Sequence, residues 1–336
     1  MNILTAVCLI LGSFLGAGFV SGKEVACYFS QHGSVSCWSC VLCGLLFFLL
    51  IMFFFGISSN VKNTSEFVSV YFKKSSKLVE WLFAICILIF TGSMLAGTSA
   101  LASSLGYNQT LIMSITVVLA FFVVINNVKG LCNVNIILVP VLILVLVITI
   151  SGGEYTPVYS NHIVQAITSG GVYVFINIVT LGLLIIEIGN KYSKKEKLII
   201  SIISTVVITA LLIGVNYSII TNDLSDNIMP NLFLSSRNST LYIIMQIGIY
   251  VGLFTTLISN VFLLSGFVKK YIKSNTLSVL ISLFLGLLIS LCGFDNIVGF
   301  IYIFISIVGF WVVVIGLCKN KTKRDNNSKC VNKKSV

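Results

Sequence analysis

The residues that suggest chemistry lie in the first apolar stretch of the chain, where three glycines precede a charged pair. Gly16, Gly18 and Gly22 fall within seven residues, and Lys23 and Glu24 follow directly. Closely spaced glycines weaken a helix, and an ionisable side chain inside an apolar segment is costly and marks a functional site by default. Interrupted apolar segments of this kind are typical of solute-binding sites in membrane transporters. We therefore expect the first helix to break here.

A break at this depth exposes backbone groups that can bind a ligand. Free N–H and C=O groups are tolerated inside a membrane only where they are buried in protein or line a cavity. A second half-helix would direct the positive end of its dipole inward, which favours a substrate carboxylate, whereas freed carbonyls can bind a small cation. The residues predicted to bind substrate here are Gly16, Ala17, Gly18, Phe19, Ser21, Gly22 and Glu24. In the alternative interpretation, Lys23 and Glu24 form a polar cluster that reaches out to the membrane interface.

The composition indicates an all-α protein with many membrane-spanning helices. Of the 336 residues, 57% are hydrophobic and only 9% are charged, whereas soluble domains have roughly 25% charged residues. A spanning helix needs about 20 apolar residues. Ten spans are predicted, at 3–31, 35–57, 78–105, 109–126, 132–150, 163–189, 197–221, 240–268, 275–292 and 297–317.

The distribution of charge predicts the orientation of these spans. If the N-terminus is cytoplasmic, nearly all of the 21 lysine and arginine residues fall on inner connections or in the tail, and the outer connections hold only Arg237. This is the positive-inside pattern. We predict a multi-pass protein of the cytoplasmic membrane with both termini cytoplasmic and the lipid bilayer as its partner. No basic groove with interleaved aromatic residues indicates nucleic-acid binding.

A turn-rich joint divides the predicted spans into two blocks of five. The blocks are residues 1–150 and 163–317, joined by an outer connection at 151–162 and followed by a basic cytoplasmic tail at 318–336. An odd number of spans inverts the second block relative to the first, which is the inverted repeat of many transporters. The sixth span should therefore break like the first, at Gly170 and Gly171, and place Tyr173 and Asn177 at the substrate. Alternatively, the glycine pair only permits close helix packing.

The eighth span carries hydroxyl groups at helical spacing. Thr255 and Ser259 share one face, as do Thr256 and Asn260. Their oxygens suit a small hard cation such as sodium. The alternative is that these hydroxyls bond back to their own helix.

Other polar residues indicate structural roles. Glu187 lies close to Lys191 and Lys194, which predicts an ion pair at the cytoplasmic rim. Both histidines, His32 and His162, fall at outer boundaries, and no nucleophile–base pair or metal-ligand set lies inside a span. The sequence therefore predicts neither an enzyme nor a cofactor other than an ion.

The segment Gly16-Ala-Gly-Phe-Val-Ser-Gly-Lys-Glu24 resembles the first helix of the YkvI-type bacterial membrane proteins, within the amino acid–polyamine–organocation superfamily. The family pattern Gly-Ala-Gly-Phe-x-Ser-Gly-x-Glu is met at every fixed position, and Lys23 stands where the family has glutamine. Length and span count agree over nearly the whole chain except the tail. The resemblance implies a LeuT-like fold with discontinuous first and sixth helices. By the same analogy, a sodium ion would lie between the backbone of Gly16 and Phe19 and the hydroxyls of Thr255, Thr256 and Ser259.

Two functions fit this interpretation. The leading hypothesis is a secondary active transporter that moves a small solute, an amino acid, by alternating access with sodium coupling. By the same resemblance, proton-coupled relatives place a lysine of the fifth span near the sodium position, and the predicted fifth span here, 132–150, holds no lysine. The alternative is a non-transporting sensor on the same fold, similar to the membrane subunit of spore-germinant receptors. The sequence indicates a small-molecule substrate and identifies no protein partner.

Overall fold

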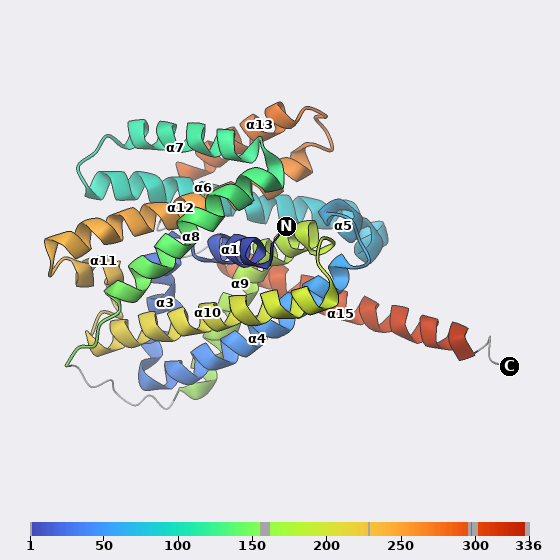
Figure 1. Ribbon diagram of the computed structural model, residues 1–336, viewed down its shortest axis with the longest axis horizontal. Coiled ribbons are helices and arrows are strands. Elements are labelled where there is room, and N and C mark those ends of the chain that lie inside the picture. Colours follow the sequence, from blue (N-terminus) through green and yellow to red (C-terminus); the bar gives the residue numbers. More distant parts are fainter. Residues whose placement is uncertain (1, 155–161, 228, 295–296, 298–301, 333–336) are drawn as a thin grey trace.

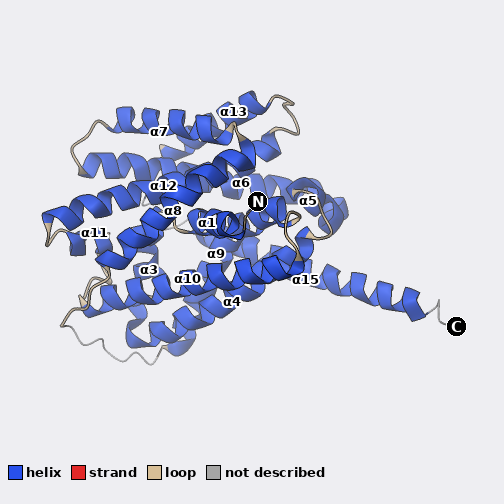
Figure 2. Ribbon diagram, in the orientation of Figure 1, coloured by secondary structure: helices blue, strands red, loops and turns tan. Residues whose placement is uncertain are grey.

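The computed structural model describes residues 2–154, 162–227, 229–294, 297 and 302–332, with side chains as far as Cys318. Every regular element within these ranges is helical (Figure 2). The apolar composition predicts this result, because a chain that crosses a bilayer must satisfy its backbone hydrogen bonds within each span. The protein is an all-α polytopic membrane protein.

Helices lie at all ten predicted spans. The first span consists of three short helices, α1 (Ile3–Phe14), α2 (Ala17–Val20) and α3 (Lys23–Tyr28). The other spans are α4 (Ser36–Ser58), α6 (Ser76–Ser104), α7 (Gln109–Val124), α8 (Asn127–Thr149), α9 (Ile163–Gly189), α10 (Lys194–Thr221), α12 (Ser239–Val268), α13 (Asn275–Ser290) and α15 (Tyr302–Asn332). Shorter elements connect them: η1 (Ser30–Val35), α5 (Thr64–Phe72), η2 (Lys73–Ser75) and α11 (Pro230–Ser235).

The outer faces of these helices are apolar. Trp38, Ile137 and Val164 are 67%, 67% and 70% exposed, and many leucines lie beside them on the surface. A soluble protein rarely exposes large contiguous apolar patches. These faces therefore contact lipid, and the polar side chains gather inside the bundle or at its ends.

The broken first span lies at the centre of the bundle (Figure 1). α1 packs against α8, α9, α10 and α12. On one side of it, α6 packs against α7, α12 and α13, and on the other side α4 packs against α9 and α10. Side chains from both groups of helices therefore reach the break.

The helix contacts follow the five-plus-five order predicted from the sequence. If each helix is replaced by the helix five spans away in the chain, the pair α1 and α8 becomes α9 and α15. In the same way, α4 and α9 become α10 and α1, and α6 and α7 become α12 and α13. Every one of these pairs is in contact. These three pairs are consistent with the predicted repeat, and the division of the chain into two blocks stays a prediction.

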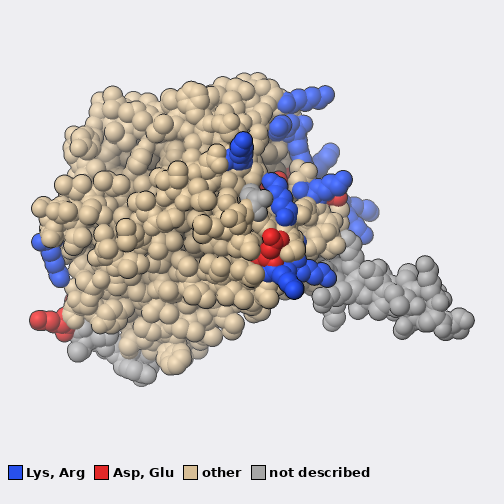
Figure 3. All heavy atoms as spheres, in the orientation of Figure 1, with Lys and Arg blue, Asp and Glu red and all other residues tan. Residues whose placement is uncertain are grey.

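Positive charges collect at one end of the molecule. In Figure 3 most lysine and arginine side chains on the visible face lie at the end that holds α5 and the beginning of α15, and few lie elsewhere. The region around α5 is a connection predicted to be cytoplasmic. This asymmetry is the one that the positive-inside pattern requires, and the orientation itself stays a prediction.

The break predicted in the sixth span is wrong. α9 runs without interruption through Gly170 and Gly171. A Cβ atom at Gly170 would lie 2.4 Å from Ser39 Oγ and 2.6 Å from Cys43 Sγ of α4, whereas one at Gly171 would have nothing within 4 Å. Gly170 therefore lets α9 approach α4 closely, which is the packing role that a glycine pair can also have.

This packing makes two neighbouring glycines respond differently to the same change. We expect Gly170→Ala to destabilise the protein by about 1–3 kcal/mol because the added methyl group overpacks the contact with α4. Gly171→Ala should be neutral or slightly stabilising because alanine favours the helix. Thermal unfolding of the purified variants in detergent measures both. Equal effects at the two positions would contradict a packing role specific to Gly170.

Candidate functional site

The first helix breaks where the glycines predict. α1 ends at Phe14, Gly16 has an extended backbone with ψ 175°, and the short α2 follows. Gly22 then adopts a left-handed conformation with φ 84° and starts α3. A residue with a side chain is strained there, so Gly22 is required for the chain to change direction between the two short helices.

Gly16 and Gly18 bring two different side chains against the backbone of the break. A Cβ atom at Gly16 would lie 3.4 Å from Thr256 Oγ1 of α12. One at Gly18 would lie 2.3 Å from Glu24 Oε1, so the carboxylate of Glu24 folds back over Gly18. The two glycines of the predicted motif therefore hold a hydroxyl group on one side of α2 and a carboxylate on the other.

The carboxylate of Glu24 lies in a buried, aromatic environment. The side chain is 8% exposed, and it makes no ion pair with any residue that the structure describes. Tyr173 of α9 is fully buried beside it, and the Tyr173 hydroxyl faces the carboxylate without the geometry of a complete hydrogen bond. The Tyr173 ring also contacts Tyr28 and Phe29, with centroids 5.6 and 5.3 Å away. Glu24 and Tyr173, predicted from separate spans, therefore meet.

The other predicted residues of α9 do not project into the break. The Asn177 amide donates to the carbonyl of Tyr173 in its own helix, 3.0 Å away. Gly170 packs against α4, and Gly171 has open space beside it. Tyr173 is therefore the predicted residue of this helix that supplies a polar side-chain group at the break.

The predicted cation ligands divide into one that crosses to the first span and two that bond to their own helix. Thr256 Oγ1 donates to the carbonyl of Gly12 at 3.1 Å. Thr255 Oγ1 donates to the Gly252 carbonyl at 3.2 Å, and Ser259 Oγ donates to the Thr255 carbonyl at 3.0 Å. The back-bonding weighed as an alternative is therefore found for Thr255 and Ser259 and not for Thr256.

The carbonyl that accepts a hydrogen bond from α12 belongs to Gly12, one turn before the Gly16 carbonyl that the motif suggests. The carbonyls of Gly16 and Phe19 accept hydrogen bonds from the N–H groups of Val20 and Gly22, at 3.0 Å each. The Gly12 carbonyl receives Thr256 instead. Oxygen atoms of α1 and α12 thus face one another, and a hard cation would find carbonyl and hydroxyl ligands between these helices.

Two asparagines lie beside α1, and sequence reasoning had named Asn260 as a candidate oxygen ligand but had missed Asn135. Asn135 of α8 and Asn260 of α12 are fully buried, and the Asn135 side-chain oxygen and both polar atoms of Asn260 have no hydrogen-bond partner. A Cβ atom at Gly12 would lie 1.9 Å from Asn135 Oδ1. Burying an unpaired amide is costly. The signal in the sequence was an amide in the middle of an apolar span.

One side of the break is covered by α11, in a connection predicted to be outer. The Asn231 N–H donates to the Ser21 carbonyl at 3.0 Å, and Asn231 Nδ2 donates to the Val20 carbonyl at 2.9 Å. Asn231 is 4% exposed. The Lys23 ammonium lies 5.5 Å from the centroid of the Phe294 ring. These contacts close the route to the break from the side of α11.

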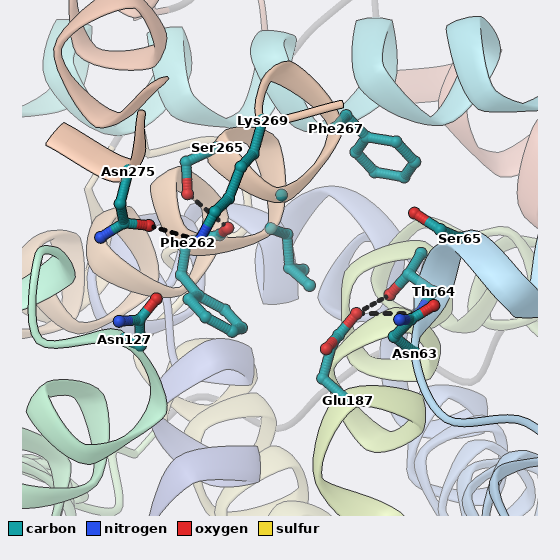
Figure 4. Close-up of a pocket in the computed structure, with 12 residues that line it drawn as sticks. Asn63, Thr64, Ser65, Asn127, Glu187, Phe262, Ser265, Phe267, Lys269 and Asn275 are labelled. Carbon is teal, nitrogen blue, oxygen red and sulfur yellow. Dashed lines mark hydrogen bonds between the residues drawn. The ribbon is translucent and has the colours of Figure 1, made fainter. Parts of the chain in front are cut away.

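A polar cavity of about 290 Å³ opens at the opposite end of the bundle (Figure 4). Its walls come from five elements, and the lining residues are Asn63, Thr64, Ser65, Asn127, Glu187, Phe262, Leu263, Ser265, Gly266, Phe267, Lys269 and Asn275. In Figure 4 the Lys269 side chain reaches toward Asn275, where Nζ donates to Oδ1 at 3.3 Å. The cavity includes connections predicted to be cytoplasmic.

The role predicted for Glu187 is wrong. It accepts hydrogen bonds from the Thr64 N–H at 2.8 Å and the Thr64 hydroxyl at 2.6 Å. No ion pair joins it to Lys191 or Lys194 among the described residues. The carboxylate thereby satisfies a free N–H in the first turn of α5, where a negative charge is favourable. Glu187 anchors α5 to the end of α9.

Comparison with known proteins agrees with this architecture. No family model matches the chain. The uncharacterized membrane protein YkvI of Bacillus subtilis (strain 168) is 24% identical over 333 residues, which cover 94% of this chain and 95% of that protein. Among solved structures, the chain is similar to Mhp1, described as a nucleobase-cation-symport-1 family transporter. The closed conformation of Mhp1 with bromovinylhydantoin bound gives a TM-score of 0.58 at 12% identity, covering 85% of this chain and 70% of Mhp1. The inward-facing conformation gives 0.57 at 14% identity, covering 91% and 72%.

These likenesses establish the fold. Both conformations of Mhp1 match over most of this chain, so this chain has the same arrangement of helices as a transporter. The sequence identity is too low to carry over a substrate or an ion. The function of this chain must be argued from its own site.

The contact between Gly18 and Glu24 is tested by a double-mutant cycle. We expect Gly18→Ala to destabilise the protein by about 1–3 kcal/mol, because the new methyl group displaces the carboxylate. In a background of Glu24→Ala the same change should cost much less, because the displaced group is gone. Gly56→Ala, where an added Cβ meets nothing within 4 Å, is the matched control. Additive effects in thermal unfolding would show that the two residues are not in contact.

Proposed function

We propose that this protein is a secondary active transporter that moves a small solute across the cytoplasmic membrane by alternating access. The observation that carries the proposal is the break in the first helix, which lies at the centre of the bundle and is lined by buried polar groups. Discontinuous helices with such groups form the binding sites of many secondary transporters. The arrangement of helices, shared with Mhp1, is a second support.

Two features at opposite ends of the bundle support alternating access. Asn231 and α11 cover the break on one side, and a polar cavity of about 290 Å³ lies at the other end. With the predicted orientation, this cavity is on the cytoplasmic side. The opposite state must release Asn231 from the carbonyls of Val20 and Ser21 and close the cavity around Glu187.

The solute that we propose is an amino acid. Glu24 and the Tyr173 hydroxyl offer acceptors for an ammonium group. The backbone between Gly16 and Gly22 offers N–H groups for a carboxylate. α3 has only six residues, so its dipole is weak. The backbone N–H groups at the break are therefore stronger donors to a carboxylate than the dipole of α3.

We further propose that a sodium ion couples transport, held by the Gly12 carbonyl and the hydroxyls of Thr255 and Thr256. These are oxygen ligands, which sodium prefers. Thr256 meets the Gly12 carbonyl between α1 and α12, and Thr255 is the neighbouring residue on α12. When bound, the ion supplies a positive charge, and the concentration gradient of the ion across the membrane drives solute movement. Ser259, whose hydroxyl bonds within α12, lies one turn away and supports the Thr255 backbone.

Substitution of the threonine that crosses to the first span tests this coupling. In proteoliposomes, we expect wild-type protein to accumulate an amino acid under an inward sodium gradient and not under a choline gradient. Thr256→Val should lower the sodium-driven uptake at least tenfold, because it keeps the shape of the side chain and removes the oxygen. Thr168→Val, at an exposed hydroxyl that bonds within α9, is the control and should transport normally.

Two results would contradict the proposal. Uptake that is equal in sodium and choline would exclude sodium coupling and leave transport intact. Amino-acid binding without uptake in any ion gradient would instead favour the sensor hypothesis, because a sensor binds its ligand and does not move it.

A further inference from the structure

The single buried carboxylate at the break has no counter-charge within the described chain. Glu24 is 8% exposed and makes no ion pair with a described residue. An ionised carboxylate away from water is strongly unfavourable unless it is paired or hydrogen-bonded. The adjacent Lys23 points along another direction, with its ammonium over the Phe294 ring. The carboxylate of Glu24 therefore leaves an unpaired negative charge at the break, which suits a positively charged ligand.

The Tyr173 hydroxyl faces the same carboxylate. Tyr173 is fully buried beside Glu24, and the geometry between its hydroxyl and the Glu24 carboxylate is not that of a complete hydrogen bond. Buried polar groups are nearly always paired, so an orphan at a candidate site indicates a ligand or an ordered water. A donor placed between the carboxylate and the hydroxyl would satisfy both groups.

Aromatic rings surround this pair. The Tyr173 ring lies 6.1 Å from Phe14, 5.6 Å from Tyr28 and 5.3 Å from Phe29, measured between centroids. Aromatic faces attract ammonium groups, most strongly where water is excluded. A carboxylate among aromatic rings recognises a positively charged nitrogen, whereas a solute with only a negative charge would be repelled by Glu24.

From this geometry we infer that the transported solute carries a positively charged amine, which Glu24 and Tyr173 bind at the break, and that the amine is the obligatory part of the solute. This inference rests on the proposed transport function and narrows it. A carboxylate on the solute is then optional, and simple amines are substrates or competitors. Tyr173 is a specificity residue because its hydroxyl accepts from or donates to the same ligand as Glu24.

Matched sets of compounds test the inference. Each set contains an amino acid, the amine without its carboxylate, and the acid without its amine: alanine, ethylamine and propionate; leucine, 3-methylbutylamine and 4-methylpentanoate; phenylalanine, phenethylamine and 3-phenylpropionate. A ligand that binds the folded state raises the unfolding temperature. Thermal shift of the purified full chain, in sodium and in choline, identifies the binding set, and uptake into proteoliposomes is measured with the same compounds.

Three variants separate charge from structure. We expect Glu24→Gln to weaken binding of the amine about 10- to 100-fold, because a charge-assisted hydrogen bond is lost. Tyr173→Phe should weaken binding about 2- to 10-fold, because it removes the hydroxyl and keeps the ring. Glu154→Gln removes an exposed carboxylate and should change neither the binding of the amine nor the unfolding temperature.

The outcomes decide between clear alternatives. Binding by the amino acid and the amine of one set but not by the acid, lost in Glu24→Gln, supports the inference. Binding by the acid, or unchanged amine binding in Glu24→Gln, overturns it even if uptake shows that the protein is a transporter. Intact binding with loss of gradient-driven uptake in Glu24→Gln also overturns it and identifies Glu24 as a proton carrier. Sodium-driven uptake of none of the compounds, with no thermal shift, overturns both proposals.

Discussion

The structure depends on one constraint, which is that a helix broken inside an apolar bundle must find partners for the backbone groups that it frees. At the break these partners come from the second half of the chain. Thr256 of α12 donates to the Gly12 carbonyl, and Asn231 donates to the carbonyls of Val20 and Ser21. Without these contacts, each unpaired group would cost several kcal/mol in a lipid environment.

The constraint also sets how the fold can move. The continuous α9 and the broken first span occupy matching positions in the two halves, yet the first span has a break whose freed backbone groups are held by other helices. α9 is fixed instead by close packing of Gly170 against α4, and packed contacts do not deform gradually. A change between two states would therefore exchange hydrogen bonds around the first span, with α9 and α4 moving together as a rigid pair.

Much of the fold could be predicted from the sequence because the bilayer imposes a length and a polarity on every span. The broken first helix was also predictable, since three glycines fall within seven residues. One of them, Gly22, adopts the left-handed backbone that glycine favours. The fate of Gly170 was not, because a glycine that breaks a helix and one that permits close packing look alike until the residue opposite, Cys43, is known. Glu187 was assigned to nearby lysines, whereas its partner Thr64 is distant in the chain and could not be read from spacing.

The two candidate ligand positions are joined by a very short element. Gly16 contacts Thr256, and Gly18, two residues later, contacts Glu24. Gly16 directly precedes α2, and Gly18 belongs to its single turn of four residues, which has the break at either end. A cation that draws Thr256 and the Gly12 carbonyl together fixes this turn and, with it, the floor beneath Glu24. In the proposed mechanism, a ligand at either position would favour the same placement of α2, and each would strengthen binding of the other by the same factor. Coupling between the proposed ion and solute would then need no long pathway through the protein, only a rigid turn that both hold.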